Sequence, residues 1–223
     1  MAIVGFVGFQ GSGKDTAADY LVNFYGYRRD SFASTLKDAV AHVFGWDRTM
    51  LEGRTSASRE WREQVDTWWA ERLNMPNLTP RWVLQYWGTD VCRVGFHDDI
   101  WIASLENKMR KTTDNIVISD VRFPNEITAI HNAGGIVVRV MRGPEPEWYE
   151  DALAFNQGPE RNYRWALSRG KLEDAKIHAS EYSWIGQPID HTINNDSTVD
   201  ALFNQIQELV KSRDSSLLVS TVV

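Results

Sequence analysis

The sequence predicts an α/β protein in which a parallel sheet is covered by helices on both faces. Two observations support this class. An apolar run near the N-terminus is followed by a glycine-rich turn and then by a segment with helical spacing. A second alternation of apolar strand, helix and apolar strand lies between residues 115 and 142. Ligands of such sheets bind at the carboxyl ends of the strands, so the polar residues that follow each strand are the first candidates for a site.

The composition is that of a globular protein with one hydrophobic core, and we expect residues 1–223 to form a single domain. Acidic side chains outnumber basic ones by 30 to 24, so the surface repels polyanions and we expect no stable binding of nucleic acid. Cys92 is the only cysteine, which excludes an internal disulfide and fits a reducing compartment. The apolar N-terminal run lacks a basic leader, so we predict a cytoplasmic protein without a membrane segment.

The first third of the chain alternates between strand-like and helical segments. Residues 2–9 are apolar on both faces, as in a central parallel strand, and residues 15–26 carry apolar side chains at helical spacing. A short strand is predicted within residues 28–35, followed by a helix over residues 36–46. The polar, Arg-rich and Trp-rich segment 47–77 also has helical spacing, and we interpret it as a helical excursion from the sheet.

The rest of the chain returns to the sheet pattern after one more helix. Thr79 as N-cap and Pro80 at the first helical position predict where that helix begins. A buried strand, a helix and another strand follow between Asn115 and Arg142. The segment from Gly143 to Gly186 has no strand-like run, so we interpret it as a helical lid. The remaining predicted elements are a strand within residues 190–195 and a helix over residues 198–212.

The turn after the first predicted strand has the spacing of a phosphate-binding loop, or P-loop. In the sequence "GFQGSGKDT", glycines let backbone N–H groups curl around a phosphate, and Lys14 reaches its β and γ oxygens. The N-terminus of the following helix adds partial positive charge. A P-loop alone is shared by ATPases, GTPases and kinases, so by itself it predicts a bound nucleotide phosphate. The residues of the loop predicted to contact this phosphate, and so to bind ATP in a kinase, are Gly11, Ser12, Gly13, Lys14, Asp15 and Thr16.

Asp15 stands where the common P-loop pattern has Ser or Thr, and Thr16 follows one residue later. A carboxylate beside a phosphate site is unfavourable unless it faces Mg²⁺, a basic residue or the N-terminus of its own helix. The sequence leaves these alternatives open.

The acceptor site must be sought in other polar segments. Arg81 and Gln85 are four residues apart on one predicted helix, so the guanidinium and the amide share a face and are suited to a phosphate and a base edge. Arg59 and Arg62 lie among carboxylates and are equally consistent with surface ion pairs. We interpret four tryptophans as core residues rather than base-stacking platforms: Trp68, Trp69, Trp82 and Trp87.

The motifs "GSGKDT", "LKDA", "GTD", "DVR" and "TINND", in this order, resemble the bacteriophage deoxynucleoside monophosphate kinase family. The resemblance spans most of the chain and extends more distantly to adenylate and dephospho-coenzyme A kinases. It implies a P-loop NTPase fold, ATP with Mg²⁺ as phosphoryl donor, a 5′-deoxynucleotide as acceptor, and a location in the host cytoplasm. It leaves a homodimer open.

The resemblance also implies roles for single residues. Thr16 and Asp120 are expected to hold the metal, and Glu181 is expected to face the nucleotide pocket. Asn194 and Asn195 follow the last strand, where related kinases contact adenine, although a plain turn fits equally well. The implied catalytic residues are Lys14, Asp120 and Arg122. The implied acceptor residues are Lys37, Arg59, Arg81 and Arg122 at the phosphate, and Gln85, Gly88, Thr89, Trp101, Asp120 and Glu181 around the nucleotide.

Three other functions remain open at this point. A kinase for dephospho-coenzyme A would phosphorylate a hydroxyl group and so should need a general base, whereas a nucleotide phosphate is already ionised near neutral pH. A P-loop ATPase or nucleic-acid-processing module would need a basic groove, which the acidic composition disfavours. A catalytically silent nucleotide-binding protein would not need Lys14, Arg81 and Arg122 together.

Overall fold

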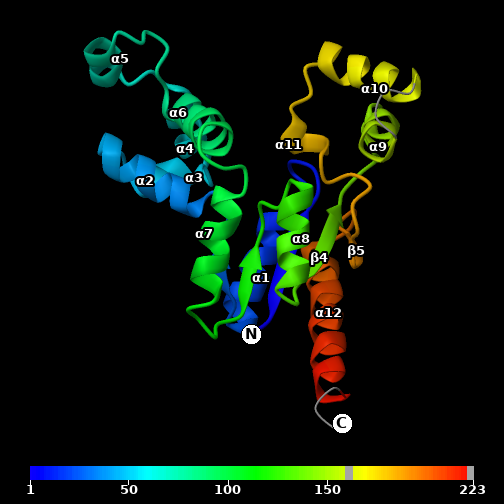
Figure 1. Ribbon diagram of the computed structural model, residues 1–223. Coiled ribbons are helices and arrows are strands. Elements are labelled where there is room, and N and C mark those ends of the chain that lie inside the picture. The colour runs from blue at the N-terminus through cyan, green and yellow to red at the C-terminus, as the bar shows by residue number, and fades with distance from the viewer. Residues whose placement is uncertain (159–162, 220–223) are drawn as a thin grey trace. The chain divides into compact units, whose positions relative to one another are not determined.

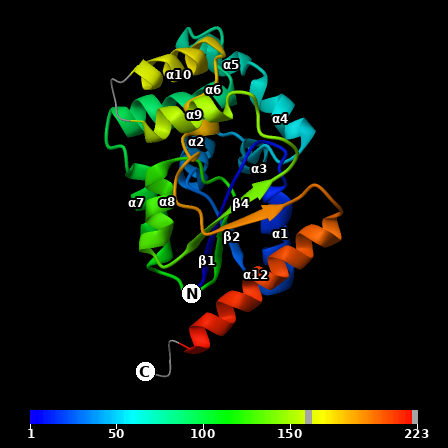
Figure 2. The same ribbon diagram turned by 90° about the vertical axis from the view of Figure 1, so that its right-hand side faces the viewer.

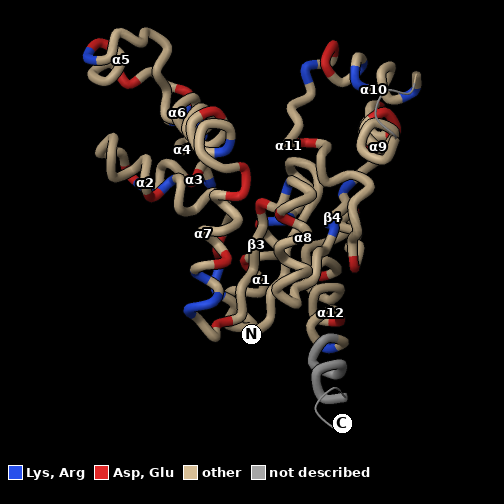
Figure 3. The backbone as a smooth tube through the Cα atoms, viewed as in Figure 1, with Lys and Arg blue, Asp and Glu red and all other residues tan. Residues whose placement is uncertain are grey.

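The computed structural model describes residues 1–158 and 163–219, with side chains described as far as Ser212. The chain forms two compact units. Unit 1 combines Met1–Ser31 with Thr113–Val223, and unit 2 is the continuous segment Phe32–Thr112 between them. Basic and acidic residues are interspersed along the helices of both units (Figure 3).

Unit 1 contains a sheet of five parallel strands in the order β2-β3-β1-β4-β5. The central strand β1 is buried along its whole length, which explains its uninterrupted apolar sequence. The predicted parallel sheet is confirmed. The strands are β1 (Ile3–Val7), β2 (Arg28–Asp30), β3 (Ile116–Ile118), β4 (Ile136–Met141) and β5 (His191–Asn194).

Helices cover both faces of this sheet, as predicted (Figure 1). Successive side chains of a strand point to opposite faces of the sheet. On one face, Phe6 of β1 packs with α1 (Lys14–Tyr25) and α12 (Val199–Val219) in one apolar core. Gly5 faces α8 (Pro124–Asn132), where a Cβ atom would lie 2.5 Å from Ile130 Cδ1. Helix α12 continues beyond its predicted end to Val219.

The connections from two neighbouring strands leave the sheet on opposite faces. Strand β1 leads into α1, and the adjacent strand β3 leads into α8. Such a reversal opens a crevice beyond the carboxyl ends of the two strands, where α/β proteins bind their ligands. In unit 1 this position is occupied by the P-loop after β1 and by residues 119–122 after β3.

The segment between β4 and β5 is helical where the structure describes it, as predicted. Its helices are α9 (Tyr149–Gln157), α10 (Tyr163–Asp174) and α11 (Ala179–Tyr182), and α9 packs against α10 (Figure 2). Phe9 of the P-loop packs edge-on against Trp148 and Trp184, with ring centroids 5.4 and 5.2 Å away. This aromatic cluster joins the P-loop to both ends of the segment.

Unit 2 is helical where the structure describes it. The predicted N-cap is confirmed, because Thr79 Oγ1 accepts a hydrogen bond from the amide of Trp82 at 3.1 Å. Trp69, Trp82 and Trp87 pack against the core of this unit, but Trp68 is 62% exposed, so its interpretation as a core residue was wrong. The elements are α2 (Ser34–Phe44), α3 (Arg48–Glu52), α4 (Ser56–Glu63), α5 (Thr67–Leu73), α6 (Pro80–Tyr86), the π-helix η1 (Trp87–Val94) and α7 (Ile100–Met109).

Candidate active site

The backbone of the P-loop can form only with glycine at three positions. Gly8, Gly11 and Gly13 have φ angles of 139°, 80° and 105°, a region that other residues rarely adopt. A Cβ atom at Gly8 would lie 2.4 Å from the carbonyl oxygen of Val140, and one at Gly13 would lie 2.4 Å from Asn195 Nδ2. The loop is therefore fitted closely between β4 and the residues after β5.

Lys14 folds back onto the loop that precedes it. Its Nζ atom donates to the carbonyl oxygens of Gly8 and Phe9, both at 2.7 Å. Burial first and the positive charge of Arg122 second lower the pKa of Lys14 to about 8, although Asp15 and Glu181 act in the opposite direction. Lys14 and Arg122 therefore lie within electrostatic reach of each other, as a site for a polyphosphate requires.

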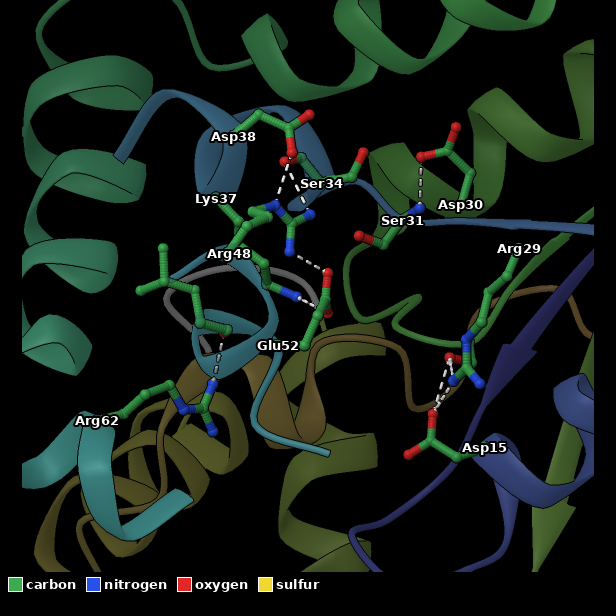
Figure 4. Close-up of polar contacts among 12 residues, drawn as sticks. Asp15, Arg29, Asp30, Ser31, Ser34, Lys37, Asp38, Arg48, Glu52 and Arg62 are labelled. Carbon is green, nitrogen blue, oxygen red and sulfur yellow. Dashed lines mark hydrogen bonds and ion pairs between the residues drawn. The ribbon is translucent and has the colours of Figure 1, made fainter. Parts of the chain in front are cut away.

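The structure provides a basic partner for Asp15. Its carboxylate pairs with the guanidinium of Arg29, at the middle of β2, and accepts a hydrogen bond from Ser119 Oγ at 3.0 Å (Figure 4). Arg29 also donates to Asp19 at 2.6 Å. Asp15 also lies in the first turn of α1, so two of the alternatives left open by the sequence are observed together: a basic partner and the N-terminus of its own helix. Sequence reasoning missed Arg29, because β2 and α1 are brought together only by the sheet.

The residues after β3 approach the same site. Arg122 donates to Glu181 Oε1 at 3.2 Å, and the two side chains are about half exposed. Glu126 is a buried helix cap, because its carboxylate accepts from the amides of Arg122 and Phe123 at 2.8 and 3.1 Å. This cap fixes the backbone that carries Arg122. His178 caps α11 by accepting a hydrogen bond from the amide of Ser180 at 3.2 Å.

A cavity of about 300 Å³ adjoins the P-loop. Asn195, which donates to the carbonyl oxygen of Ser12 at 2.8 Å, lines it, whereas Asn194 does not and instead accepts from the amide of Asp196. Arg142 lines the cavity too and was missed in the sequence, although its position directly after β4 follows the strand-end rule. The lining residues are Gly11, Gly13, Lys14, Asp15, Thr16, Arg142, Asn195, Ser197, Val199 and Leu202.

Arginines also occur in the predicted lid between Gly143 and Gly186. Arg169 pairs with Glu173 at 2.8 Å and lies over the ring of Trp165 at 5.6 Å. Arg161 lies outside the described residues.

In unit 2, Lys37 shares a carboxylate with a residue that the sequence did not single out. Lys37 Nζ and Arg48 Nη1 donate to the two oxygens of Glu52, at 2.7 and 2.5 Å (Figure 4). Burial alone would raise the pKa of Glu52, but the two cations lower it to about 2. Arg48 is itself bound to Asp38 at 2.6 Å. The carboxylate of Glu52 therefore fixes Lys37 in place.

Three arginines of unit 2 influence one another. The pKa of Arg62 is lowered by burial and by the positive charges of Arg81 and Arg59. Arg81 is paired loosely with Glu63 at 3.3 Å, and Arg59 is exposed and donates to the carbonyl oxygen of Arg54. The predicted pair of Arg59 and Arg81 is thus joined by Arg62, which had been assigned no role in binding.

The residues implied for the sugar and base lie at the junction of α6 and η1. Trp101 is buried and donates from Nε1 to the carbonyl oxygen of Gly88 at 2.9 Å. Gln85 and Thr89 are exposed on either side of Gly88. Short π-helices are frequent at functional sites, because the extra residue per turn redirects side chains. Trp101 therefore anchors the segment that presents Gln85 and Thr89.

The oxygen groups near the P-loop suit a hard divalent cation. Thr16 is the third residue of α1, two positions after Lys14. Asp120 lies two residues beyond the end of β3, the strand beside β1. Within the described part of the chain, no group of three or more His, Cys, Asp or Glu side chains could hold a metal by itself. Mg²⁺ normally keeps waters and phosphate oxygens and takes only one or two protein ligands, so this donor set fits it.

None of the described helices is long and apolar enough to cross a membrane.

The family model and the two relatives that match this chain are all described as deoxynucleotide monophosphate kinases. The family model described as "Deoxynucleotide monophosphate kinase" matches residues 64–158. A protein of Acanthamoeba polyphaga mimivirus named "Putative deoxynucleotide monophosphate kinase" is 35% identical over 156 residues, which cover 64% of this chain and 75% of the relative. The deoxynucleoside-5′-monophosphate kinase of Escherichia phage T5 is 28% identical over 173 residues, covering 56% of this chain and 69% of the relative.

The solved structures are less similar to this chain in sequence than these two relatives are. A dephospho-CoA kinase from Campylobacter jejuni has a TM-score of 0.42 at 12% identity, over 96% of this chain and 97% of that one. A shikimate kinase from Acinetobacter baumannii has a TM-score of 0.39 at 15% identity, over 99% and 94%. At these scores the likeness does not by itself establish a common fold.

Proposed function

Because the chain belongs to the deoxynucleotide monophosphate kinase family, it transfers a phosphoryl group from ATP to a deoxynucleoside monophosphate, and we propose which of its residues do so. The observation that carries the assignment is the meeting of Lys14, Arg122, Asp15 and Glu181 beyond the carboxyl ends of β1 and β3.

The P-loop holds the phosphates of ATP. Its backbone N–H groups and the N-terminus of α1 contact the β-phosphate, and Lys14 moves from the carbonyl oxygens of Gly8 and Phe9 to the β and γ oxygens. The cavity lined by Arg142, Asn195 and Val199 receives the adenosine part. Arg29 neutralises Asp15, so that this carboxylate does not repel the polyphosphate.

The basic residues of unit 2 hold the acceptor. Lys37 and Arg81 contact the 5′-phosphate, and Gln85, Thr89 and the backbone at Gly88 contact the sugar and base. Arg59 is a weaker candidate, because its side chain is exposed and bound to a backbone carbonyl. No general base is needed, since the acceptor phosphate is already ionised near neutral pH.

Positive charge supplies most of the rate acceleration. Phosphoryl transfer has a loose transition state in which charge spreads over the oxygens of the transferred group, so correctly placed cations stabilise it. Lys14 and Arg122 supply two of these charges, and Arg122 gives up its contact with Glu181 as the phosphates bind. Thr16 and Asp120 would hold Mg²⁺, which adds positive charge when it is bound with ATP. The single cysteine and the viral relatives favour the host cytoplasm as the place of action.

The test is an assay of ADP release coupled to NADH oxidation, run across the four dNMPs, the matching ribonucleotides, dephospho-coenzyme A, and no acceptor. We expect turnover with at least one dNMP well above that with the other acceptors. ADP release that does not depend on any acceptor would instead indicate an ATPase, and turnover with dephospho-coenzyme A alone would move the acceptor to a hydroxyl group.

A further inference from the structure

Arg62, in the last turn of α4, has a polar atom that no described residue satisfies. Its Nε atom is buried and has no hydrogen-bond partner within residues 1–158 and 163–219. The guanidinium makes one hydrogen bond, from Nη1 to the carbonyl oxygen of Leu51, and at 3.4 Å this bond is long (Figure 4). A buried donor without an acceptor is costly, so its retention needs a reason.

The electrostatic surroundings of Arg62 are also unbalanced. Three nearby cations of unit 2 have a carboxylate within 4 Å: Glu52 for Lys37 and Arg48, and Glu63 for Arg81. Arg62 has no such partner in the described part of the chain. Its pKa is lowered by burial first and then by the positive charge of Arg81, with Arg59 adding to the effect, while the carboxylates of Glu63 and Glu52 act in the opposite direction. Arg62 is therefore half buried near two like charges, and the carboxylates that oppose them are not in contact with it.

The guanidinium of Arg62 lies directly against the turn between α3 and α4. A Cβ atom at Gly53 would lie 2.1 Å from Arg62 Nη2, so the glycine lets the guanidinium pack onto the backbone of this turn. Gly53 also has a φ angle of 68°. Arg59, one turn earlier on the same helix, is exposed and has no comparable constraint.

We infer that Arg62 binds the 5′-phosphate of the deoxynucleotide acceptor together with Arg81, which makes it a residue that recognises the acceptor. This rests on the proposed function. A phosphate dianion supplies oxygens for the Nε atom and the free edge of the guanidinium in a bidentate arrangement, and it neutralises two neighbouring cations at once. The alternative is a purely structural role, in which Arg62 only tethers α4 to the carbonyl of Leu51.

The experiment measures how much the phosphate group contributes to binding. Dissociation constants are determined by calorimetry for a dNMP and for the deoxynucleoside that lacks the phosphate, and their ratio is compared in wild type, Arg62→Gln and Arg62→Lys. We expect Arg62→Gln to reduce this ratio at least about tenfold, because a charge-assisted bond is lost, while binding of the deoxynucleoside stays unchanged. Arg62→Lys, which keeps the charge but not the planar fork, should fall between the two.

Arg72→Gln is the matched control, since Arg72 is an exposed arginine on α5 and should leave the ratio as in wild type. A ratio that is equal in wild type, Arg62→Gln and Arg62→Lys would overturn the inference. If Arg62→Gln does not fold, Arg62→Lys decides, and a wild-type ratio in that variant also overturns it. Because binding is measured without turnover, a wild-type protein that phosphorylates no dNMP would refute the proposed function separately.

Discussion

At the scale of single residues, Lys14 is the group whose contacts must change most when ATP binds. In the structure its ammonium satisfies two carbonyl oxygens of the loop, which a polyphosphate would replace. We expect Lys14→Met to lower kcat by about 10²-fold or more with little change in binding of dNMP, because the charge acts on the transferring group. Steady-state kinetics with Lys111→Met, at an exposed lysine, as control would check this. Turnover within a few-fold of wild type would contradict it.

The lowered pKa of Lys14 predicts a pH dependence of ATP binding. The free protein begins to lose this proton near pH 8, whereas bound phosphates favour the charged form and raise the pKa. Binding should therefore take up a proton above pH 8, and affinity should fall as the pH rises further. Calorimetry at pH 8.5 in two buffers of different ionisation enthalpy should show uptake of roughly half a proton or more. Lys14→Met should lose this uptake, and its persistence there would assign the proton to another group.

The sequence predicted those site residues whose role depends on their immediate neighbours in the chain. Lys14 and its glycines form a local motif, so they could be interpreted from their own segment. Arg29 and Glu52 could not be predicted in this way, because the role of each depends on an ion pair with a residue from another segment. Arg29 meets Asp15 through the pairing of strands, and Glu52 meets Lys37 through the packing of two helices.

At the scale of elements, a buried hydrogen bond joins α7 to η1. Trp101 Nε1 donates to Gly88 in a buried environment, and phenylalanine would leave that carbonyl without its donor. We expect Trp101→Phe to lower the free energy of unfolding by about 1–3 kcal/mol in urea titrations and to raise the KM for dNMP. Trp68→Phe, at an exposed ring, should change the stability by less than about 0.5 kcal/mol. Equal stability in both variants would remove the anchoring role.

The helical segment between Gly143 and Gly186 is predicted to act as a lid over ATP. Phe9 packs against Trp148 and Trp184, and Glu181 holds Arg122, so filling the P-loop should alter contacts of α11 and of the segment's start. Excluding water would protect the phosphoryl group from hydrolysis. An analogue that joins adenosine and a deoxynucleoside through a phosphate chain should slow hydrogen exchange there more than either nucleotide alone.

Hydrogen exchange that is already slow in the free protein, and unchanged by the analogue, would show a rigid cap instead.

The existence of the helices between Gly143 and Gly186 was predictable, since the segment lacks any strand-like run. The bounds of α12 were not, because nothing in the local sequence ends that helix at Ser212.

At the scale of the whole molecule, the two units should respond to different substrates. ATP is proposed to bind the P-loop of unit 1, and the cations proposed for the acceptor phosphate lie mainly in unit 2. We expect ATP alone to slow hydrogen exchange in α1 and around Asn195, and dNMP alone to slow it in α4 and α6. Each ligand at 100 times its dissociation constant should add about 2.7 kcal/mol of stability. Equal protection of both units by ATP alone would contradict this division.

The order of the strands also governs when the protein can fold. Strand β1 ends at Val7, but the strands that pair with it begin only at Ile116 and Ile136, so a growing chain cannot assemble its central sheet until the whole of unit 2 has been made. Unit 2 is continuous from Phe32 to Thr112 and has its own apolar core. During synthesis unit 2 can therefore become compact first, while the apolar residues of β1 stay exposed to solvent until β3 and β4 have been made. The strand that leads into the phosphate loop is thus made before unit 2 but is buried only after unit 2 is complete.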